Sequence, residues 1–225
     1  MAITVTNKLN TITSIGSGSS SHTTGSITIT SGKSYLISVV YYDQIGNSVT
    51  SNSINSVAGI SWQKQTPTAN GGNGYYCAFV GTAASSTTSG ITINVSTATT
   101  ALCFIMVNID EISGASSTPI VQQAVSGGAP PSLSAFASSN NGTYAYCVDI
   151  GWASLSPKSG WSQGGYYAGG STYYNPSFLT EWIASNDTSP TCTGFNGWTT
   201  GWACEIQAAS AGATSNNVCI INLGC

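Results

Sequence analysis

The sequence predicts an all-β protein, a two-sheet antiparallel β-sandwich with a jelly-roll-like arrangement. Apolar residues recur at every second position in many short segments, and most are β-branched or aromatic, which suits a pleated, half-buried surface. Clusters of Gly, Ser, Asn and Pro separate these segments at short intervals. Helical periodicity is nearly absent, and strands without alternating helices favour two antiparallel sheets packed face to face.

The expected strands share this alternating pattern and are bounded by turn-forming residues. In chain order they are residues 27–29, 35–42, 57–62, 75–80, 91–95, 102–109, 120–125, 144–152, 177–184 and 201–209. The segment 177–185 (SFLTEWIAS) also fits one or two helical turns, so strand and helix both stay open there.

The length of 225 residues is compatible with a single all-β domain spanning residues 1–225. We expect its core at about residues 27–209, preceded by an N-terminal arm, 1–26, and followed by a C-terminal tail, 210–225. The longest apolar run, 101–107, is far shorter than the ~20 residues that a membrane helix needs. The first residues, MAITVTNKLN, lack the basic and apolar regions of a secretory signal. No membrane association is expected.

Charge is scarce along the chain, whereas Ser, Thr and Gly are abundant. There are 36 Ser, 28 Thr and 26 Gly, but only four Lys, no Arg and seven acids, so 5% of the residues are charged. Soluble domains usually contain roughly 25% charged residues. A net charge of −3 without basic clusters argues against nucleic acid as a partner. The 41% hydrophobic content argues against disorder.

The seven cysteines contain no CxxC pair, and the lone His22 lies in a Ser/Gly-rich segment, so neither a metal site nor a cofactor is expected. A thiol nucleophile would also lack a base. Cysteines within apolar strands are usually small buried hydrophobes; these are Cys77, Cys103 and Cys147. Candidate disulfides are Cys192–Cys204, which flank a hairpin-like stretch, and Cys219–Cys225 in the tail. Either would need an oxidising compartment.

Paired carboxylates are what a glycosidase requires. Asp110 and Glu111 are adjacent, so on a strand they point to opposite faces and cannot act on one bond. Glu181 and Glu205 lie beside Trp-containing segments and could converge only through the fold. The alternative is that the acids are solvated or cap turns. The sequence therefore identifies no catalytic residue and predicts a protein that is not an enzyme.

Aromatic residues concentrate in the Gly-rich stretch between residues 152 and 202. Large aromatic side chains that are exposed together mark protein interfaces, and flat rings on Gly-rich loops also stack on sugars. Packing in the core or against loops is the third interpretation, and all three stay open. The candidate residues are Trp161, Tyr166, Tyr167, Tyr173 and Tyr174.

The order of several segments resembles a known family. The segments are SITITSGKSYLISVVYY, INSVAGISWQKQT, an aromatic strand YYCAFV, a Thr-rich ITINV, an apolar strand closing in Glu111-Ile112-Ser113-Gly114, and a final GWACEIQA. Together, over roughly residues 27–209, they are similar to a jelly-roll-like β-sandwich domain of bacteriophage virion proteins and some bacterial surface proteins. The seven cysteines and the extension beyond residue 210 depart from this pattern.

The resemblance implies a non-catalytic structural part of a phage particle on the virion surface. A capsid decoration or cement protein and a head fibre are the first expectation, and a carbohydrate-binding or adhesion module on a tail appendage or cell surface is the alternative. A surface with little charge favours association. The expected partners are copies of the chain itself, as a trimer or lattice, and a major capsid or other virion protein, with a glycan as the alternative partner.

Overall fold

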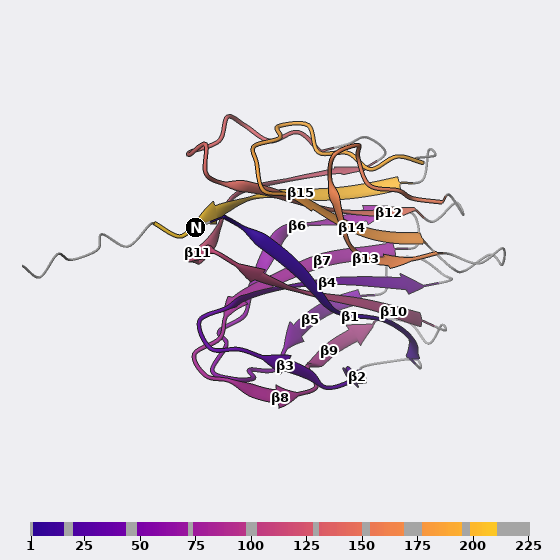
Figure 1. Ribbon diagram of the computed structural model, residues 1–225. Helices are drawn as coiled ribbons and strands as arrows, with labels where there is room; N and C mark the ends of the chain where they lie inside the picture. The colour runs from indigo at the N-terminus through magenta and orange to yellow at the C-terminus, as the bar shows by residue number, and fades with distance from the viewer. Residues whose placement is uncertain are drawn as a thin grey trace, which may run out of the picture.

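The computed structural model describes residues 2–15, 20–43, 49–71, 74–97, 103–127, 131–149, 154–168, 177–194 and 199–210. Within these ranges every regular element is a β-strand, and every named strand pair is antiparallel. The described strands form several sheets that stack as layers (Figure 1). The prediction of an all-β antiparallel sandwich is confirmed.

The central sheet has five strands in the order β1-β10-β4-β7-β6. Its strands are β1 (Thr4–Ile15), β10 (Cys103–Ser113), β4 (Ser34–Asp43), β7 (Gly74–Thr82) and β6 (Gln63–Gly71). Both faces of its middle strands are buried, which explains why β4 and β10 are almost continuously apolar instead of alternating between apolar and polar residues.

The outer sheet also has five strands, in the order β11-β15-β12-β14-β13. Its strands are β11 (Ala115–Gly127), β15 (Thr199–Ala208), β12 (Gly142–Asp149), β14 (Ser177–Ile183) and β13 (Ser162–Tyr167). Residues 177–183 thus form a strand, which decides the choice left open between strand and helix. β13 carries two consecutive glycines and little apolar patterning, and it is not among the strands predicted from the sequence.

Two small sheets cover the other face of the central sheet (Figure 1). One contains β2 (Ser20–Thr23), β9 (Thr92–Thr97) and β5 (Val49–Ile54), and the other pairs β3 (Ile27–Ile29) with β8 (Thr87–Ser89). The described chain therefore forms three layers, one more than the two predicted, with the central sheet in the middle.

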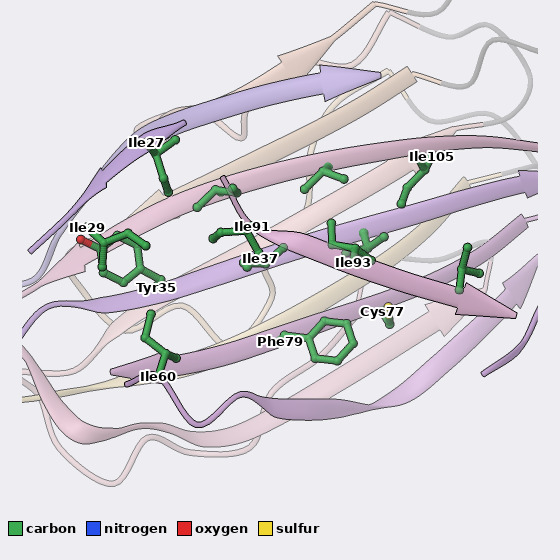
Figure 2. Close-up of a cluster of buried hydrophobic side chains, with 14 of the residues drawn as sticks. Ile27, Ile29, Tyr35, Ile37, Ile60, Cys77, Phe79, Ile91, Ile93 and Ile105 are labelled. Carbon is green, nitrogen blue, oxygen red and sulfur yellow. The ribbon is translucent and has the colours of Figure 1, made fainter. Parts of the chain in front are cut away.

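Two apolar cores hold these layers together. On β4, Ile37 and Val39 face the first core, between the central and the small sheets, and Figure 2 shows isoleucines of this core with Tyr35 and Phe79. Leu36 and Val40 point the opposite way into the second core, between the central and outer sheets. Successive side chains of a strand point to opposite faces, so one strand serves both cores.

The N-terminal segment is part of the sandwich and does not form a separate arm. β1 pairs with β10 along its length, from Thr4 opposite Ser113 to Ile15 opposite Cys103. Ile3 and Val5 are buried in the second core. The described core therefore begins near residue 3. This corrects the boundary expected from the sequence, which placed an N-terminal arm at residues 1–26.

A second correction concerns residues 57–62, which do not form the expected strand. Ala58 and Gly59 adopt positive φ values of 52° and 69°, and the Ile60 amide donates to the Val57 carbonyl at 2.9 Å. These residues form a tight turn before β6. Ile60 is buried in the first core, so an apolar residue that packs from a turn produced the misleading alternation.

The space between the central and outer sheets is bridged near two of their edges. Asn10 on β1 donates through Nδ2 to the Tyr166 carbonyl on β13 at 2.5 Å. On the other side, Thr82 at the end of β7 donates to the Ser117 carbonyl on β11 at 3.4 Å. These two hydrogen bonds join the central sheet to the outer sheet.

Candidate functional site

Four carboxylates are fully buried within the described structure, one of them Asp149 at the end of β12. The other three, Asp110, Glu181 and Glu205, hold its layers and covering segments together. Asp110 on β10 points into the space between the two five-stranded sheets, whereas Glu181 and Glu205 lie on the outer face of the outer sheet. All three have 0% exposure. A buried carboxylate is costly unless it is hydrogen-bonded, so the partners of each acid indicate what it does.

Asp110 receives hydrogen bonds from strands of both sheets. Asn7 on β1 donates to Oδ1 at 2.8 Å, and Asn108 on the same strand as Asp110 donates to Oδ2 at 2.7 Å. From the outer sheet, the Tyr144 hydroxyl donates to Oδ2 at 2.6 Å and Thr180 Oγ1 at 3.1 Å. Burial raises the pKa of Asp110, and these hydrogen bonds offset part of the shift.

Two glycines of β13 make room for this Asp110 network. A Cβ at Gly165 would lie 1.8 Å from Asn108 Oδ1, and one at Gly164 would lie 2.4 Å from Thr180 Oγ1. The β13–β14 register shifts at this point, and the Gly165 amide donates to Thr180 Oγ1 at 2.6 Å. The Gly-Gly pair lets the edge strand approach the buried polar groups closely.

Glu205 on β15 fastens the segment 131–141 across the outer sheet. Its Oε2 accepts from Gln122 Nε2 at 2.6 Å, and its Oε1 accepts from the Ala137 amide at 2.9 Å and from Asn141 Nδ2 at 2.5 Å. Asn141 Oδ1 in turn accepts from the Ala208 amide at 3.0 Å. Every described partner of Glu205 belongs to a strand of the sheet or to the segment that covers it.

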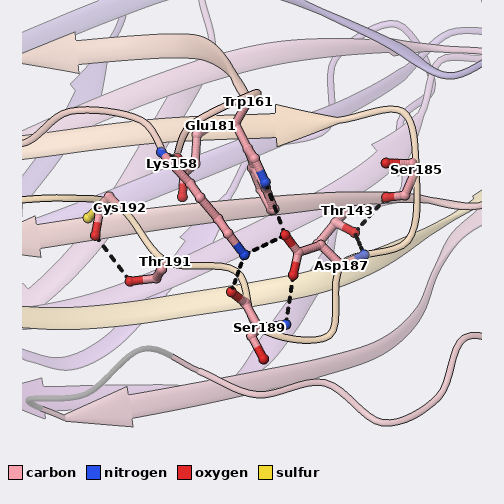
Figure 3. Close-up of polar contacts among 9 residues, drawn as sticks. All are labelled: Thr143, Lys158, Trp161, Glu181, Ser185, Asp187, Ser189, Thr191 and Cys192. Atoms are coloured by element: carbon pink, nitrogen blue, oxygen red, sulfur yellow. Dashed lines mark hydrogen bonds and ion pairs between the residues drawn. The ribbon is translucent and has the colours of Figure 1, made fainter.

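A second polar cluster, the Lys158 cluster, lies on the same outer face and comprises Lys158, Trp161, Glu181, Asp187 and Ser189 (Figure 3). Lys158 Nζ lies 2.6 Å from Asp187 Oδ2 and donates to the Ser189 carbonyl at 2.8 Å. The backbone amide of Lys158 donates to Glu181 Oε2 at 2.7 Å. Lys158 therefore joins β14, through Glu181, to the segment that follows β14, through Asp187 and Ser189.

The pKa values of the two acids of this cluster shift in opposite directions. Burial raises the pKa of Glu181 to about 7, against the opposing effect of the Lys158 amide and charge. Its Oε1 has no hydrogen-bond partner among the described residues. Burial also raises the pKa of Asp187, but hydrogen bonds from Lys158, Ser189 and Trp161 outweigh that effect and hold it below its usual value.

Glu181 and Glu205 are the pair of acids that the sequence suggested could converge. Both lie on the outer face of the outer sheet, but they do not belong to one site. Glu181 is opposite Ala145, which is opposite Ala203 on β15. Two strand spacings and a two-residue offset place the Cα atoms of the two acids about 12 Å apart. An apolar cluster that includes Ala145, Ala203 and Trp161 occupies the same face. Each acid has its own partners, and the structure does not bring them together on one bond.

Asp110 and Glu111 point to opposite faces of β10, as expected. Asp110 faces the outer sheet, whereas Glu111 accepts a 2.9 Å hydrogen bond from Tyr35 in the first core and lies 3.3 Å from Lys8 Nζ. The two side chains therefore belong to different layers.

The candidate aromatic residues do not form an exposed platform in the described structure. Trp161 is 8% exposed, packs beneath the outer segments and donates through Nε1 to Asp187 Oδ2 at 3.2 Å. Tyr166 and Tyr167 are half-buried and pack against two different apolar clusters. Tyr173 and Tyr174 lie outside the described residues. The one large hydrophobic side chain exposed in the described part is Val121.

The expected Cys192–Cys204 disulfide is not formed, and both residues are free thiols. Cys204 belongs to the second core, on the inner face of the outer sheet, whereas Cys192 packs on the outer face with Cys147. The sheet itself separates the two sulfurs, which is the physical reason why this pairing fails. Cys219 and Cys225 lie outside the described residues.

A groove of about 580 Å³ lies at one end of the outer sheet. Its described lining contains no aromatic or charged side chain. The groove therefore offers backbone groups, hydroxyls and amides, but no ring on which a sugar could stack. Its lining includes Ser138, Asn140, Asn141, Ala184, Gln207 and Ser210.

Lys158, Asp187 and Asn141 belong to these networks but were not predicted from the sequence. Lys158 is one of only four lysines and follows a proline, which indicates a fixed turn, but its partners are distant in the sequence. The described residues contain no group of three or more His, Cys, Asp or Glu placed to hold a metal ion. No helix in the described ranges has the length and apolarity to cross a membrane.

No protein-family model, curated protein or solved structure matches this chain.

Proposed function

We propose that this chain is a non-enzymatic structural component of a bacteriophage virion. The proposed role is a capsid decoration or cement protein, or a head fibre, on the surface of the particle. Its partners would be copies of itself, as a trimer or lattice, and a major capsid or other virion protein. The order of strand segments that resembles jelly-roll-like virion domains supports this assignment.

The observation that carries the proposal is that three buried acids are hydrogen-bonded to other parts of the same chain. Asp110, Glu181 and Glu205 are completely buried, and their described partners are strands or covering segments of the same chain. Such carboxylates cross-link layers, because each accepts hydrogen bonds from elements distant in the sequence. A role in holding the sandwich together accounts for all three acids without a substrate.

The scarcity of charge supports an assembly role. Two of the four lysines are already paired with acids, Lys8 with Glu111 and Lys158 with Asp187. A surface of hydroxyl and amide groups loses little hydration energy when a neighbouring subunit covers it, compared with a charged surface. Val121 is the one large hydrophobic side chain exposed in the described part. Contacts between the described surface and a neighbouring subunit would therefore be mainly polar.

The test is to locate the chain on particles. An antibody raised against the purified chain is used to label particles purified on a density gradient from cells that carry the gene, and the particles are imaged by electron cryomicroscopy. We expect the chain to band with the particles, as symmetric copies bound to a shell or appendage protein. A chain that bands apart from all particles overturns the proposal.

The carbohydrate-binding alternative has a separate test, which is retention of the purified chain on a glycan array. Trp161, its leading stacking candidate, is buried and hydrogen-bonded to Asp187, so we expect no specific retention. Retention on one glycan class that Trp161→Phe leaves intact and Trp161→Ala removes would favour the alternative.

A further inference from the structure

Cys147 and Cys192 lie together on the outer face of the outer sheet. Cys147 is in the middle of β12, opposite Leu179 on β14, and Cys192 belongs to the segment that follows β14 and folds back over the sheet. Both are buried, with exposures of 1% and 2%, in one apolar cluster with Leu155 and Leu179. Residues distant in sequence thus place two cysteines in one buried apolar cluster.

The backbone fixes Cys192 in this position. The next residue, Thr193, forms an antiparallel bridge with Ser156, with N–H···O distances of 3.1 and 2.8 Å. Earlier in the same segment, Asp187 is held by Lys158. Cys147 and Cys192 share one apolar cluster, and the Cys147 thiol raises the pKa of the Cys192 thiol, so the sulfurs are already neighbours while both are reduced.

The other buried cysteines of the described chain are placed differently. Cys204 is in the second core, on the opposite face of the outer sheet, and Cys77 is in the first core, beyond the central sheet. A disulfide requires Cα atoms within about 7 Å and converging side chains. Of Cys77, Cys147, Cys192 and Cys204, only Cys147 and Cys192 share one apolar cluster, so they are the pair that this condition favours.

We propose that Cys147 and Cys192 form an intramolecular disulfide when the protein meets an oxidant, and that this bond staples the 184–194 segment to β12. The oxidant is a small-molecule disulfide, RSSR. One protein thiolate attacks RSSR, forming a mixed disulfide and releasing RS⁻. The second protein thiolate then attacks the protein sulfur of the mixed disulfide, forming the S–S bond and releasing the second RS⁻. The protein thiols lose two electrons and two protons, and RSSR becomes two RSH.

Reaction in the folded state requires local opening. The contact with Cys147 and burial both raise the pKa of the Cys192 thiol, so little thiolate exists near neutral pH. Bond formation is therefore expected mainly during folding, or when the segments 154–161 and 184–194 lift from the sheet. After it forms, the bond closes a loop of about 45 residues, which restricts the unfolded chain and stabilises the fold.

The test compares oxidative and reductive refolding of the full chain. The protein is refolded from urea with a mixture of oxidised and reduced glutathione, or with reductant alone, and remaining thiols are blocked with N-ethylmaleimide. Peptic peptides are then mapped by mass spectrometry under acidic conditions. The variants Cys147→Ala and Cys192→Ala remove the proposed bond, and Cys204→Ala is the matched control, a buried cysteine on the other face of the same sheet.

We expect a peptide that links Cys147 to Cys192 in the oxidised wild type and in Cys204→Ala, and not in the other two variants. The melting temperature of the oxidised wild type should exceed that of the reduced protein by on the order of 10 °C. A map that joins Cys192 to any other cysteine overturns the proposal, as do two alkylated thiols at 147 and 192 after oxidative refolding. The wild-type map decides the question even if a variant fails to fold.

Discussion

The Tyr144 hydroxyl on β12 donates a 2.6 Å hydrogen bond to Asp110 Oδ2 on β10, and both residues have 0% exposure. This contact connects the two five-stranded sheets through their shared core, where the Tyr144 ring also packs edge-on against the Trp202 ring, 6.3 Å away between centroids. A polar bond in such surroundings fixes how the sheets are aligned, because sliding one sheet would leave a buried carboxylate without its donor.

Substitutions at the two ends of this bond should have unequal effects. Tyr144→Phe removes one of several donors to Asp110, and we expect a loss of about 1–2 kcal/mol in the free energy of unfolding. Asp110→Ala removes the acceptor that Asn7, Asn108, Tyr144 and Thr180 share in the core, and we expect a loss of about 3–5 kcal/mol. Urea unfolding followed by tryptophan fluorescence measures both. An Asp110→Ala loss no larger than that of Tyr144→Phe would contradict the network.

Glu181 should make stability depend on pH below neutrality. Its pKa is about 7 in the folded protein and near 4.5 in the unfolded chain, so between these values the folded state binds more protons than the unfolded state. Its contribution to stability is therefore full below pH 4.5 and falls as the pH rises to 7, by up to about 3 kcal/mol.

Glu181→Gln isolates this contribution, because the amide cannot titrate while the other ionisable groups remain. We expect the difference in unfolding free energy between wild type and variant to change across pH 4.5–7 and to be flat above pH 8. Urea titrations at six pH values measure it. A difference that does not vary with pH would show that Glu181 titrates normally.

Gly165 should tolerate no side chain. A Cβ there would lie 1.8 Å from Asn108 Oδ1, inside the Asp110 network. We expect Gly165→Ala to destabilise the protein by about 3 kcal/mol or more, through displacement of β13 or loss of buried hydrogen bonds.

Gly160 provides the matched control, because a Cβ there meets no atom within 4 Å while φ is +85°. Gly160→Ala should destabilise by about 1–2 kcal/mol through backbone strain alone. Thermal unfolding of both variants separates steric conflict from strain. Equal losses would argue against the close approach of β13 to Asn108.

The Lys158–Asp187 ion pair should contribute little, despite its 2.6 Å separation. Both side chains are partly solvated, at 29% and 20% exposure, so we expect a coupling energy of about 0.5–1 kcal/mol that weakens in 1 M salt. A double-mutant cycle with Lys158→Met and Asp187→Asn measures this coupling. A cycle of Lys8→Met with Asp187→Asn is the control and should be additive, since these residues belong to different networks.

Strands whose apolar residues alternate or run continuously could be predicted well. Residues 35–42, 75–80 and 102–109 coincide closely with β4, β7 and β10. The prediction was wrong at 57–62, where Ile60 packs into a core from a turn. It also missed β1, although the alternation in ITVT was visible, and β13, whose glycines carry no pattern.

The candidate site was much less predictable. The opposite orientation of Asp110 and Glu111 follows from strand geometry alone and is confirmed by their partners. The Cys192–Cys204 pairing relied on nearness in the sequence, whereas the outer sheet places these sulfurs on opposite faces. Trp161 was considered for an exposed platform and is instead covered, because aromatic content does not indicate which side of a loop faces solvent.

By itself the sequence determined the strand content and the surface composition of this protein. It contains extended segments rich in β-branched residues, turns between them, and too few charged residues to cover a surface. These are local properties, and period-two patterning decides them within a few residues. Tertiary structure alone decided the three layers, the burial of both faces of the central sheet, and the meeting of Asp110 with Tyr144 and of Cys147 with Cys192. Those outcomes depend on strand order and register, which couple residues far apart in the chain and leave no mark in any one segment.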